Sequence, residues 1–282
     1  MPLYSSLLAQ APEPTGILAI IDKLARTPLS NVIIFVAICT ALRVGLFFYM
    51  KGVPQHLRSG FFSAAKIFNE FLDAVIYAGV FVFLIIRPFV IQTFYIPSGS
   101  MLDTLQLQDY IIANKFVYRY SDPQHGDIVV FKPPKYALFP GQSETDFIKR
   151  CIGVPGDLIE VKDGKLWRNG QAVNEPYLKD PFASHDFKLV KYEGRYVPVS
   201  MKGDFANNDN TTSSEYLTND LKLMKTYREL PAERIPPGYY LMMGDNRNGS
   251  FDGRAWGLIP RQAIIGRSEF IWLPISRWRI TR

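Results

Sequence analysis

Two long apolar segments near the N-terminus constrain the fold of this 282-residue chain more than any other feature. Residues 32–50, VIIFVAICTALRVGLFFYM, are interrupted only by Arg43, and residues 74–91, AVIYAGVFVFLIIRPFVI, only by Arg87 and Pro88. A helix needs about 20 apolar residues to cross a bilayer. Both segments are therefore predicted to be transmembrane helices, because their lengths disfavour the alternative, a hydrophobic hairpin buried in a soluble core.

The charges that flank these segments predict the orientation of the chain. The connection between the segments, residues 51–73, carries three positive charges, at Lys51, Arg58 and Lys66. Residues 88–114 contain neither Lys nor Arg. Since cytoplasmic loops are enriched in both, the connection is predicted to be cytoplasmic and residues 92–282 extracytoplasmic. Arg43 agrees, because its long side chain can reach the headgroups near the C-terminal end of its helix. Residues 1–31 are expected outside as well, without a removable signal peptide.

Charge and cysteine content exclude several classes of function. The net charge is +6, but the positive residues are spread thinly over residues 115–282 and form no basic cluster. We therefore expect no nucleic-acid partner. The two cysteines, Cys39 and Cys151, have neither the spacing of a zinc site nor the pattern of a disulfide framework.

The remainder of the chain has the texture of a mainly β domain. Short runs of Val, Ile, Tyr and Phe alternate with Gly, Pro, Asn and Asp. Strands are expected in segments that begin at Tyr110, Gly126, Asp146, Asp157, Gly238 and Ile264. The dipeptides Asp-Gly at 163–164 and Asn-Gly at 169–170 predict hairpin turns. Residues 179–235 are polar and are expected to form an insertion or second lobe between core strands.

The stretch IPSGSM, residues 96–101, follows closely on the second apolar segment and offers a nucleophile. Pro97 and Gly99 disfavour a regular helix or strand, so Ser100 is predicted to lie in an exposed turn. Most serines in such turns only form the turn. On position alone, Ser100 is nevertheless the best candidate nucleophile in the chain.

A nucleophilic serine needs a base, and histidine is the usual one. His56 lies in the predicted cytoplasmic connection and His185 in the polar insertion. His125 could act with Asp127 or Asp146, and this triad stays open at the level of sequence. No nucleophile-elbow pattern supports it.

Lysine is the alternative base, and Lys149 in the predicted strand DFIKRCIGV fits this role. Strand alternation places its side chain on the face of Phe147 and Cys151, whereas Arg150 points the other way. A free lysine has a pKa of about 10.4, and lowering it to about 8 requires roughly 3 kcal/mol, usually from burial away from carboxylates. The sequence neighbours of Lys149 offer an apolar wall and no counter-ion. A charged lysine at a strand edge is the alternative.

A third stretch, GDNRNGSFDGRAWG at residues 244–257, is dense in Gly, Asn, Asp and Arg. Such a stretch usually forms a turn held by side-chain to backbone hydrogen bonds. It also contains the hydroxyl of Ser250 and the pair Asp252 and Arg254. These groups could orient a base from behind.

Taken together, PSGSM, DFIKRCIGVPGD and GDNRNGSFDGRAWG, in this order behind two apolar segments, resemble the bacterial type I signal peptidases, the leader peptidases of the Ser/Lys class. The resemblance extends from about residue 70 to residue 275, and the layout is similar to that of the Gram-negative members. It implies a mainly β catalytic domain with the signal-peptidase/LexA-like fold, anchored by two N-terminal transmembrane helices.

The resemblance also implies roles for single residues. Ser100 matches the family's nucleophile and Lys149 its general base. Ser98 matches the side-chain donor of the oxyanion hole, and Ser250 matches the hydroxyl that orients the lysine.

Around these groups, Asp252 matches a carboxylate near the site that pairs with Arg254. Six residues match the lining of the family's shallow substrate pockets: Ile96, Pro97, Met101, Leu105, Phe147 and Ile148. Four further differences from the family pattern remove no catalytic group: Asp103 replaces a common proline, and Asn248, Gly249 and Gly253 alter the polar loop. Phe147 itself stands where tyrosine is frequent, which loses a hydroxyl and keeps the aromatic wall.

The implied function is removal of signal peptides from secretory preproteins after an Ala-X-Ala site. We expect a monomeric, multi-pass enzyme of the bacterial inner membrane, in contact with lipid, with its catalytic domain in the periplasm and without a metal or organic cofactor. Two alternatives belong to other classes. One is a Ser/Lys membrane protease for specialised substrates such as pilin or surface proteins, and the other is an inactive membrane-anchored binding scaffold.

Overall fold

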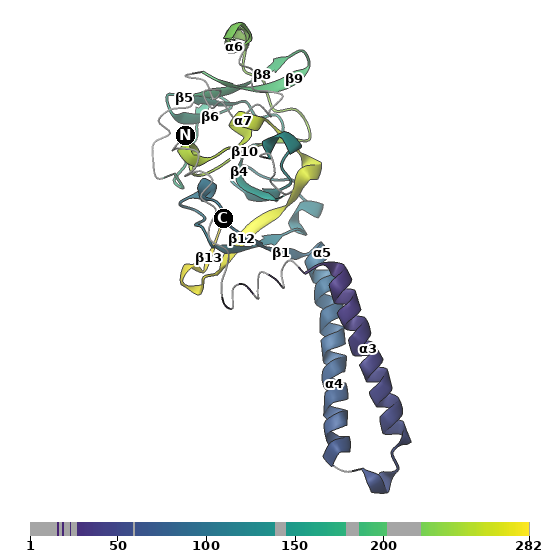
Figure 1. Ribbon diagram of the computed structural model, residues 1–282. Coiled ribbons are helices and arrows are strands. Elements are labelled where there is room, and N and C mark those ends of the chain that lie inside the picture. Colours follow the sequence, from purple (N-terminus) through teal and green to yellow (C-terminus); the bar gives the residue numbers. More distant parts are fainter. Residues whose placement is uncertain are drawn as a thin grey trace. The chain divides into compact units, whose positions relative to one another are not determined.

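The computed structural model describes residues 27–58, 60–138, 145–178, 186–201 and 221–281, together with Gly16, Ala19 and Lys23. Two compact units are distinguished, one within residues 13–92 and the other within residues 93–282. Figure 1 shows that the first is helical and the second mainly β. Of the predicted insertion at 179–235, residues 179–185, with His185, and residues 202–220 lie outside the described residues, as does most of the segment 1–31.

The helical unit is an antiparallel hairpin (Figure 1). Its helices are α3 (Leu29–Gly52) and α4 (Gly60–Val80), and the latter continues through a π-helical segment (Phe81–Ile86) into α5 (Arg87–Phe89). Just before Pro88, the backbone hydrogen bonds change from the α-helical spacing of four residues to the π-helical spacing of five. Pro88 has no backbone N–H with which to continue an α-helix. Both long helices are apolar and long enough to cross a membrane, and they leave most of their side chains unburied.

The second helix begins at Gly60, well before the predicted span at residues 74–91. Residues 60–73 supply Phe, Ile and Leu throughout, so the apolar character of this helix starts before residue 74. Most of the connection predicted at 51–73 is therefore helical. Where each membrane span begins and ends within its helix stays a prediction.

An ion pair joins the two helices of the hairpin. Arg43 Nη2 lies 3.0 Å from Asp73 Oδ1. This contact differs from the expectation that the arginine extends along its helix toward the headgroups. Because a charge at membrane depth is costly unless it is paired, Asp73 provides Arg43 with a neutralising partner inside the hairpin.

We predict that Asp73→Leu lowers the free energy of unfolding by about 1 kcal/mol in detergent, the scale of polar contacts between membrane helices. The double variant Arg43→Leu/Asp73→Leu should recover most of that loss, since no unpaired charge then remains. Thermal unfolding measures both variants. Equal destabilisation by Asp73→Leu and by Arg58→Leu, a change at the end of the hairpin, would contradict the pairing.

The described residues of the β unit form two sheets. The larger has the strand order β1 (Ile91–Tyr95), β2 (Tyr110–Asn114), β12 (Ile264–Leu273), β3 (Ile128–Phe131), β4 (Phe147–Gly153), β10 (Tyr239–Met243) and β11 (Ile259–Pro260), with β13 (Arg279–Ile280) paired to β12. The smaller has the order β7 (Gln171–Ala172), β6 (Lys165–Arg168), β5 (Ile159–Lys162), β8 (Phe187–Tyr192) and β9 (Arg195–Ser200). Two short helices accompany them, α6 (Leu221–Glu229) and α7 (Gly253–Trp256). The prediction of a mainly β domain is confirmed.

All six predicted strand segments contain strands, but the first ends early. The chain turns after Asn114, because the side-chain oxygen of Asn114 accepts hydrogen bonds from the backbone N–H groups of Phe116 and Val117 at 2.9 and 3.1 Å. A side chain that bonds its own backbone competes with the sheet ladder. The sequence pattern alone did not reveal this competition.

Both predicted hairpin turns are present. Asp163 and Gly164 have φ values of 49° and 71° between β5 and β6, and Asn169 and Gly170 have 52° and 81° between β6 and β7. Positive φ at both central residues is what a two-residue hairpin with the right-handed strand twist requires. Asn and Asp tolerate this conformation, and Gly adopts it freely.

Strand β4 lies where three hydrophobic clusters meet. Phe147 and Cys151 pack with the buried side chain of Trp256, Ile148 packs beneath the segment that carries Met101, and Ile152 belongs to the cluster shared with the smaller sheet. Lys149 is in the middle of this strand. Its position therefore follows from apolar packing on both faces of the sheet.

Candidate active site

A closed loop carries the predicted nucleophile. Its ends meet where Ile96 N donates to Asp109 O at 2.9 Å and Gln108 N donates to Ile96 O at 3.0 Å. Between them a 3₁₀ turn, Gly99–Met101, presents Ser100. The side chain of Leu105, like that of Met101, is buried in the core below. We call residues 96–109 the serine loop. Its apolar residues fix it to the core, while its small residues form the surface turn.

Ser98, Ser100 and Lys149, predicted as site residues from two separate stretches of sequence, lie together. Lys149 Nζ donates a hydrogen bond to Ser100 Oγ at 2.7 Å and a second to Ile148 O at 3.1 Å. Ser98 Oγ lies 3.3 Å from Ser100 Oγ. A hydroxyl this close to an amine can transfer its proton once the amine is neutral.

Burial lowers the pKa of Lys149 to about 8 from its ordinary value of 10.5. The charges of Asp252 and Asp245 raise this pKa, and that of Arg254 lowers it. The side chain is 5% exposed, so the loss of hydration outweighs the two carboxylates. The sequence neighbours of Lys149 gave no sign of these carboxylates, because both belong to the polar loop after β10.

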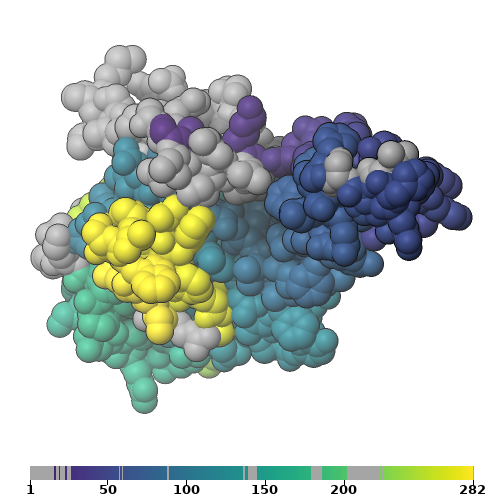
Figure 2. All heavy atoms as spheres, turned by 90° about the horizontal axis from the view of Figure 1, so that it is seen from below, coloured from purple at the N-terminus to yellow at the C-terminus, as the bar shows by residue number. Residues whose placement is uncertain are grey.

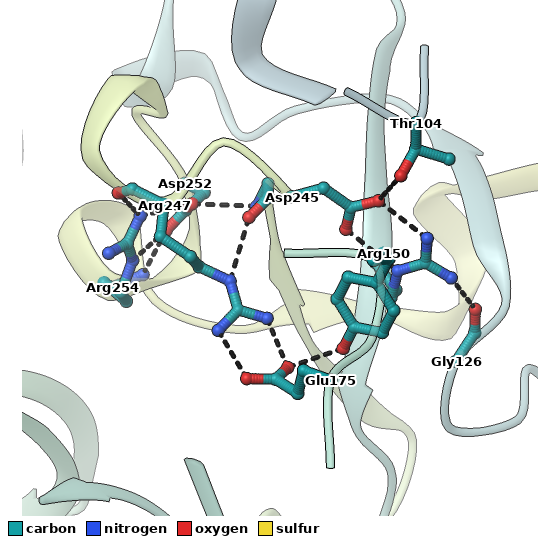
Figure 3. A network of polar contacts seen from close by, with 10 residues as sticks. Thr104, Gly126, Arg150, Glu175, Asp245, Arg247, Asp252 and Arg254 are labelled. Atoms are coloured by element: carbon teal, nitrogen blue, oxygen red, sulfur yellow. Dashed lines mark hydrogen bonds and ion pairs between the residues drawn. The ribbon is translucent and has the colours of Figure 1, made fainter. Parts of the chain in front are cut away.

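The two aspartates of that polar loop, residues 244–257, are both paired with arginines (Figure 3). Arg150 donates two hydrogen bonds to Asp245, from Nε at 2.8 Å and from Nη2 at 2.6 Å, and Thr104 Oγ1 donates to the same carboxylate at 2.5 Å. Arg254 forms a similar fork with Asp252, from Nε and Nη2, each at 2.8 Å. Each carboxylate near Lys149 is therefore already balanced by a guanidinium.

The pair of Asp252 and Arg254 also closes the loop. Burial alone would raise the pKa of Asp252, but the charge of Arg254 and its hydrogen bonds hold that pKa below the ordinary value. Gly244 N donates to Asp252 Oδ2 at 2.9 Å, and Arg254 Nη2 donates to Arg247 O at 2.7 Å. The carboxylate stays ionised and holds the two ends of the loop together.

A third pair extends the network to the segment that follows β7. Arg247 binds both carboxylate oxygens of Glu175, and its Nε donates to Gly244 O at 3.0 Å. Tyr177 OH donates to Glu175 Oε1 at 2.5 Å, and its ring lies 3.8 Å from the guanidinium carbon of Arg150. The three arginines in Figure 3 are thus fixed by paired charge and by stacking.

Asn246 holds the serine loop directly, and sequence reasoning missed it. Its side-chain Nδ2 donates to Gly99 O at 2.9 Å, and its backbone N donates to Ser100 O at 3.2 Å. Its place in the polar stretch singled out from the sequence was the only available signal. Nothing in that stretch distinguishes an amide that bonds a distant backbone from one that forms a local turn.

Ser250, predicted to orient the lysine, lies beside the site without bonding Lys149. Its buried hydroxyl is near enough to Asp252 to help lower the pKa of that carboxyl group. The hydroxyl is not in a position to form a well-aligned hydrogen bond with any described residue. At Gly244, an added Cβ would lie 2.3 Å from Ser250 Oγ and 2.4 Å from Ser100 O. Only glycine permits this approach. The orienting role of Ser250 stays a prediction.

The six predicted pocket residues divide by exposure. Ile96, Met101 and Leu105 are no more than 3% exposed and belong to the core beneath the serine loop. Ile148 is 9% exposed, Phe147 is half-buried and Pro97 is exposed. The last three are the members of this set with surface available for a substrate to contact.

The histidine alternative gains no support from the described contacts. The Nε2 atom of His125 is buried and bonds no described residue, and burial lowers the pKa of this imidazole. Asp127 instead accepts hydrogen bonds from Tyr118 OH at 2.9 Å and from Gln124 N at 3.0 Å. Within residues 60–138, no hydrogen bond or ion pair links His125 to Ser100 or to Asp127.

We predict that Asp252→Ala lowers the free energy of unfolding by about 3–5 kcal/mol, because it leaves Arg254 buried without a counter-ion. The two side chains are 0% and 2% exposed. Glu160→Gln removes a pair in which Lys162 is 58% exposed, and should cost less than about 1 kcal/mol. Chemical denaturation followed by tryptophan fluorescence measures both. Similar losses of unfolding free energy in the two variants would contradict the conclusion that Asp252 and Arg254 form a buried ion pair.

Known proteins that are similar in sequence show the family of this chain. The sequence model of the family described as "Signal peptidase, peptidase S26" matches residues 68–273. A "Probable signal peptidase I-1" of Synechocystis sp. is 35% identical over 196 residues, 69% of this chain and 78% of the relative. "Signal peptidase I" of Pseudomonas aeruginosa is 32% identical over 219 residues, 69% of either chain.

Among solved structures, a signal peptidase I from Enterococcus faecalis is 23% identical and has a TM-score of 0.32, with 52% of this chain and 97% of that chain covered. The family match and the curated relatives each span more than half of the chain. The family match, at residues 68–273, includes all three stretches from which the site is built. This chain belongs to the signal peptidase family of the S26 peptidases.

Proposed function

We propose that this protein is a membrane-bound serine endopeptidase that removes signal peptides from exported preproteins with a Ser100–Lys149 pair. The observation that carries the proposal is the 2.7 Å hydrogen bond between the two side chains, made by an amine whose pKa burial lowers to about 8. The relatives named signal peptidase I support the substrate class.

In the proposed mechanism, neutral Lys149 accepts the proton of Ser100 as Oγ attacks the scissile carbonyl. The second bond from Nζ, to Ile148 O at 3.1 Å, orients the amine toward the serine. The carbonyl oxygen, which becomes negative, is held by the backbone N–H of Ser100 and the hydroxyl of Ser98. Ser98 Oγ is only 3.3 Å from the attacking oxygen, so both groups could reach one tetrahedral centre.

The protonated lysine then returns its proton to the leaving amine, which gives an acyl-enzyme and a free mature N-terminus. Water attacks the ester, Lys149 takes its proton, and Ser100 recovers its own as the signal peptide leaves. A base with a pKa near the working pH can both accept and return this proton. An ordinary lysine would stay charged.

The substrate proposal is a short segment ending in Ala-X-Ala. Phe147 and Ile148, beside the lysine, and the exposed Pro97, before the serine turn, offer an apolar surface of limited extent. Small side chains fit a shallow surface, and larger ones would meet the packed core beneath it.

The proposed location is the outer face of the bacterial cytoplasmic membrane. Lys51, Arg58 and Lys66 lie in or near the turn between α3 and α4 and favour a cytoplasmic position for that end of the hairpin, whereas residues 88–114 carry no Lys or Arg. A signal peptide lies in the same bilayer, so anchoring the enzyme there confines both partners to one plane and lowers the entropic barrier to encounter.

We predict that kcat/KM rises about tenfold per pH unit up to about pH 8 and is flat above it, because the neutral fraction of the buried lysine limits the reaction. The sign follows from the lowered pKa of Lys149, whose active form is the deprotonated one. Cleavage of one preprotein measured from pH 6 to pH 10 tests this. A rise that continues beyond pH 10 would indicate an ordinary lysine.

We predict that Ser100→Ala yields no product and that Lys149→Arg is about a thousandfold slower than wild type, because a guanidinium stays protonated. The assay mixes detergent-solubilised protein with a preprotein bearing an Ala-X-Ala site and determines the N-terminus of the product. Ser63→Ala and Lys66→Arg make the same changes at exposed positions of α4 and should cleave normally. Cleavage by Ser100→Ala would mean that another residue attacks.

A further inference from the structure

The C-terminal segment of the β unit is firmly attached to strand β12. In β13, Ile280 pairs with Phe270 and Arg279 with Ile271. Beyond this ladder, Thr281 N donates to Glu269 O at 2.9 Å, and the hydroxyls of Thr281 and Ser268 lie 2.9 Å apart in a buried contact. These contacts fix the segment to the sheet. In the view of Figure 2, the C-terminal residues, in yellow, lie at the surface of the molecule.

From this edge, Arg277 reaches one end of the serine loop. Its guanidinium donates to both carboxylate oxygens of Asp109, from Nε at 2.8 Å and from Nη2 at 3.0 Å. The Asp109 side chain is 1% exposed, and its Oδ2 also accepts a hydrogen bond from Gln106 N at 2.8 Å. Arg277 thus balances a buried charge that itself holds the last turn of the loop.

Arg279 reaches the middle of the same loop. Its Nη2 donates to the backbone carbonyl of Thr104 and, more weakly, lies 3.4 Å from that of Asp103. The side chain of Thr104 is bound to Asp245 on its other side. Arg277 and Arg279 are not part of the three stretches that resemble the family's site.

We propose that Arg277 and Arg279 form a C-terminal clamp that positions the serine loop, so that Ser100 Oγ stays within hydrogen-bond reach of Lys149. The inference rests on the proposed function of that pair. The turn at Gly99–Met101 is not part of a strand, so its place depends on contacts at the ends and middle of the loop. Asn246 and Asp245 hold the loop from one side, and the clamp holds it from the C-terminal edge.

Both clamp residues act through the loop and contact none of the reacting groups, so their loss should lower kcat and leave KM nearly unchanged. A displacement of about 1 Å in a reacting group can reduce a rate by up to about a hundredfold. We expect Arg277→Gln to lower kcat at least tenfold and Arg279→Gln to lower it less, since Arg279 binds only backbone carbonyls. Arg277→Lys should recover part of the rate, because it keeps the charge but not the two parallel hydrogen bonds.

Arg168 provides a matched control. It pairs with Asp157 at 2.8 Å, and the exposed fractions of the two side chains are 34% for Arg168 and 6% for Asp157. The corresponding values are similar for the other pair, 25% for Arg277 and 1% for Asp109. This pair joins the end of β6 to the residues just before β5 and contacts no part of the serine loop. Arg168→Gln should therefore keep wild-type kcat even if it lowers thermal stability.

The experiment measures kcat, KM, thermal unfolding and amide hydrogen exchange of residues 96–109 for these full-length variants. The clamp predicts faster exchange in the loop and a lower kcat for Arg277→Gln. For Arg168→Gln it predicts that loop exchange and kcat are the same as in the wild type. It also predicts that Asp109→Asn combined with Arg277→Gln is no slower than the slower single variant, because both changes break one contact.

Equal loss of kcat in Arg277→Gln and Arg168→Gln, or unchanged kcat and exchange in a folded Arg277→Gln, would overturn the clamp. If the wild type cleaves no preprotein, the proposed function fails, and exchange of the loop amides decides the clamp by itself. Faster exchange in Arg277→Gln alone would then support it, and identical exchange in both variants would reject it.

Discussion

In the mechanism that we propose, burial of one amine governs the chemistry of this protein. Lys149 lies in the middle of a core strand and has lost most of its hydration, which favours its neutral form. Two carboxylates are close enough to oppose this effect, but Arg150 and Arg254 balance them. A lysine beside an unpaired aspartate would keep its proton. The arginine pairs therefore allow burial to determine the charge of the lysine.

The same pairs determine geometry as well as charge. Asp245 accepts hydrogen bonds from both Arg150, next to the lysine in its strand, and Thr104, in the loop that carries the serine. Asp252 accepts a hydrogen bond from the N–H of Gly244, a residue whose added Cβ would collide with Ser100 and Ser250. Electrostatics and position are coupled, because a change in either carboxylate alters the charge around Lys149 and the support of the serine at once.

The sequence predicted the features that depend on local pattern. Apolar length revealed the two helices, and alternation revealed the face of Lys149. Dipeptides with Asn, Asp and Gly located two hairpins. The resemblance brought Ser100 and Lys149 together, although no local pattern joins residues in different elements. Their 2.7 Å hydrogen bond is a long-range contact that only the folded chain displays.

Features that depend on tertiary contacts were not predictable in this way. Helix α4 begins at Gly60 because its apolar residues extend beyond the strictly uncharged run, and Asp73 is tolerated inside it beside Arg43. The roles of Asn246 and Arg277 depend on backbone atoms and a carboxylate that are distant in the sequence. Polar residues of this kind look the same in a turn, on a surface and in a functional contact.

The pKa of Lys149 itself is the most direct test of this account. Nuclear magnetic resonance of lysine labelled at the side chain, with Lys149 assigned from the Lys149→Arg spectrum, follows the titration of one amine. The account predicts a midpoint near 8, well below the ordinary lysine pKa of 10.5. A midpoint near 10.5 would show that burial does not neutralise the amine and that another group must take the proton of Ser100.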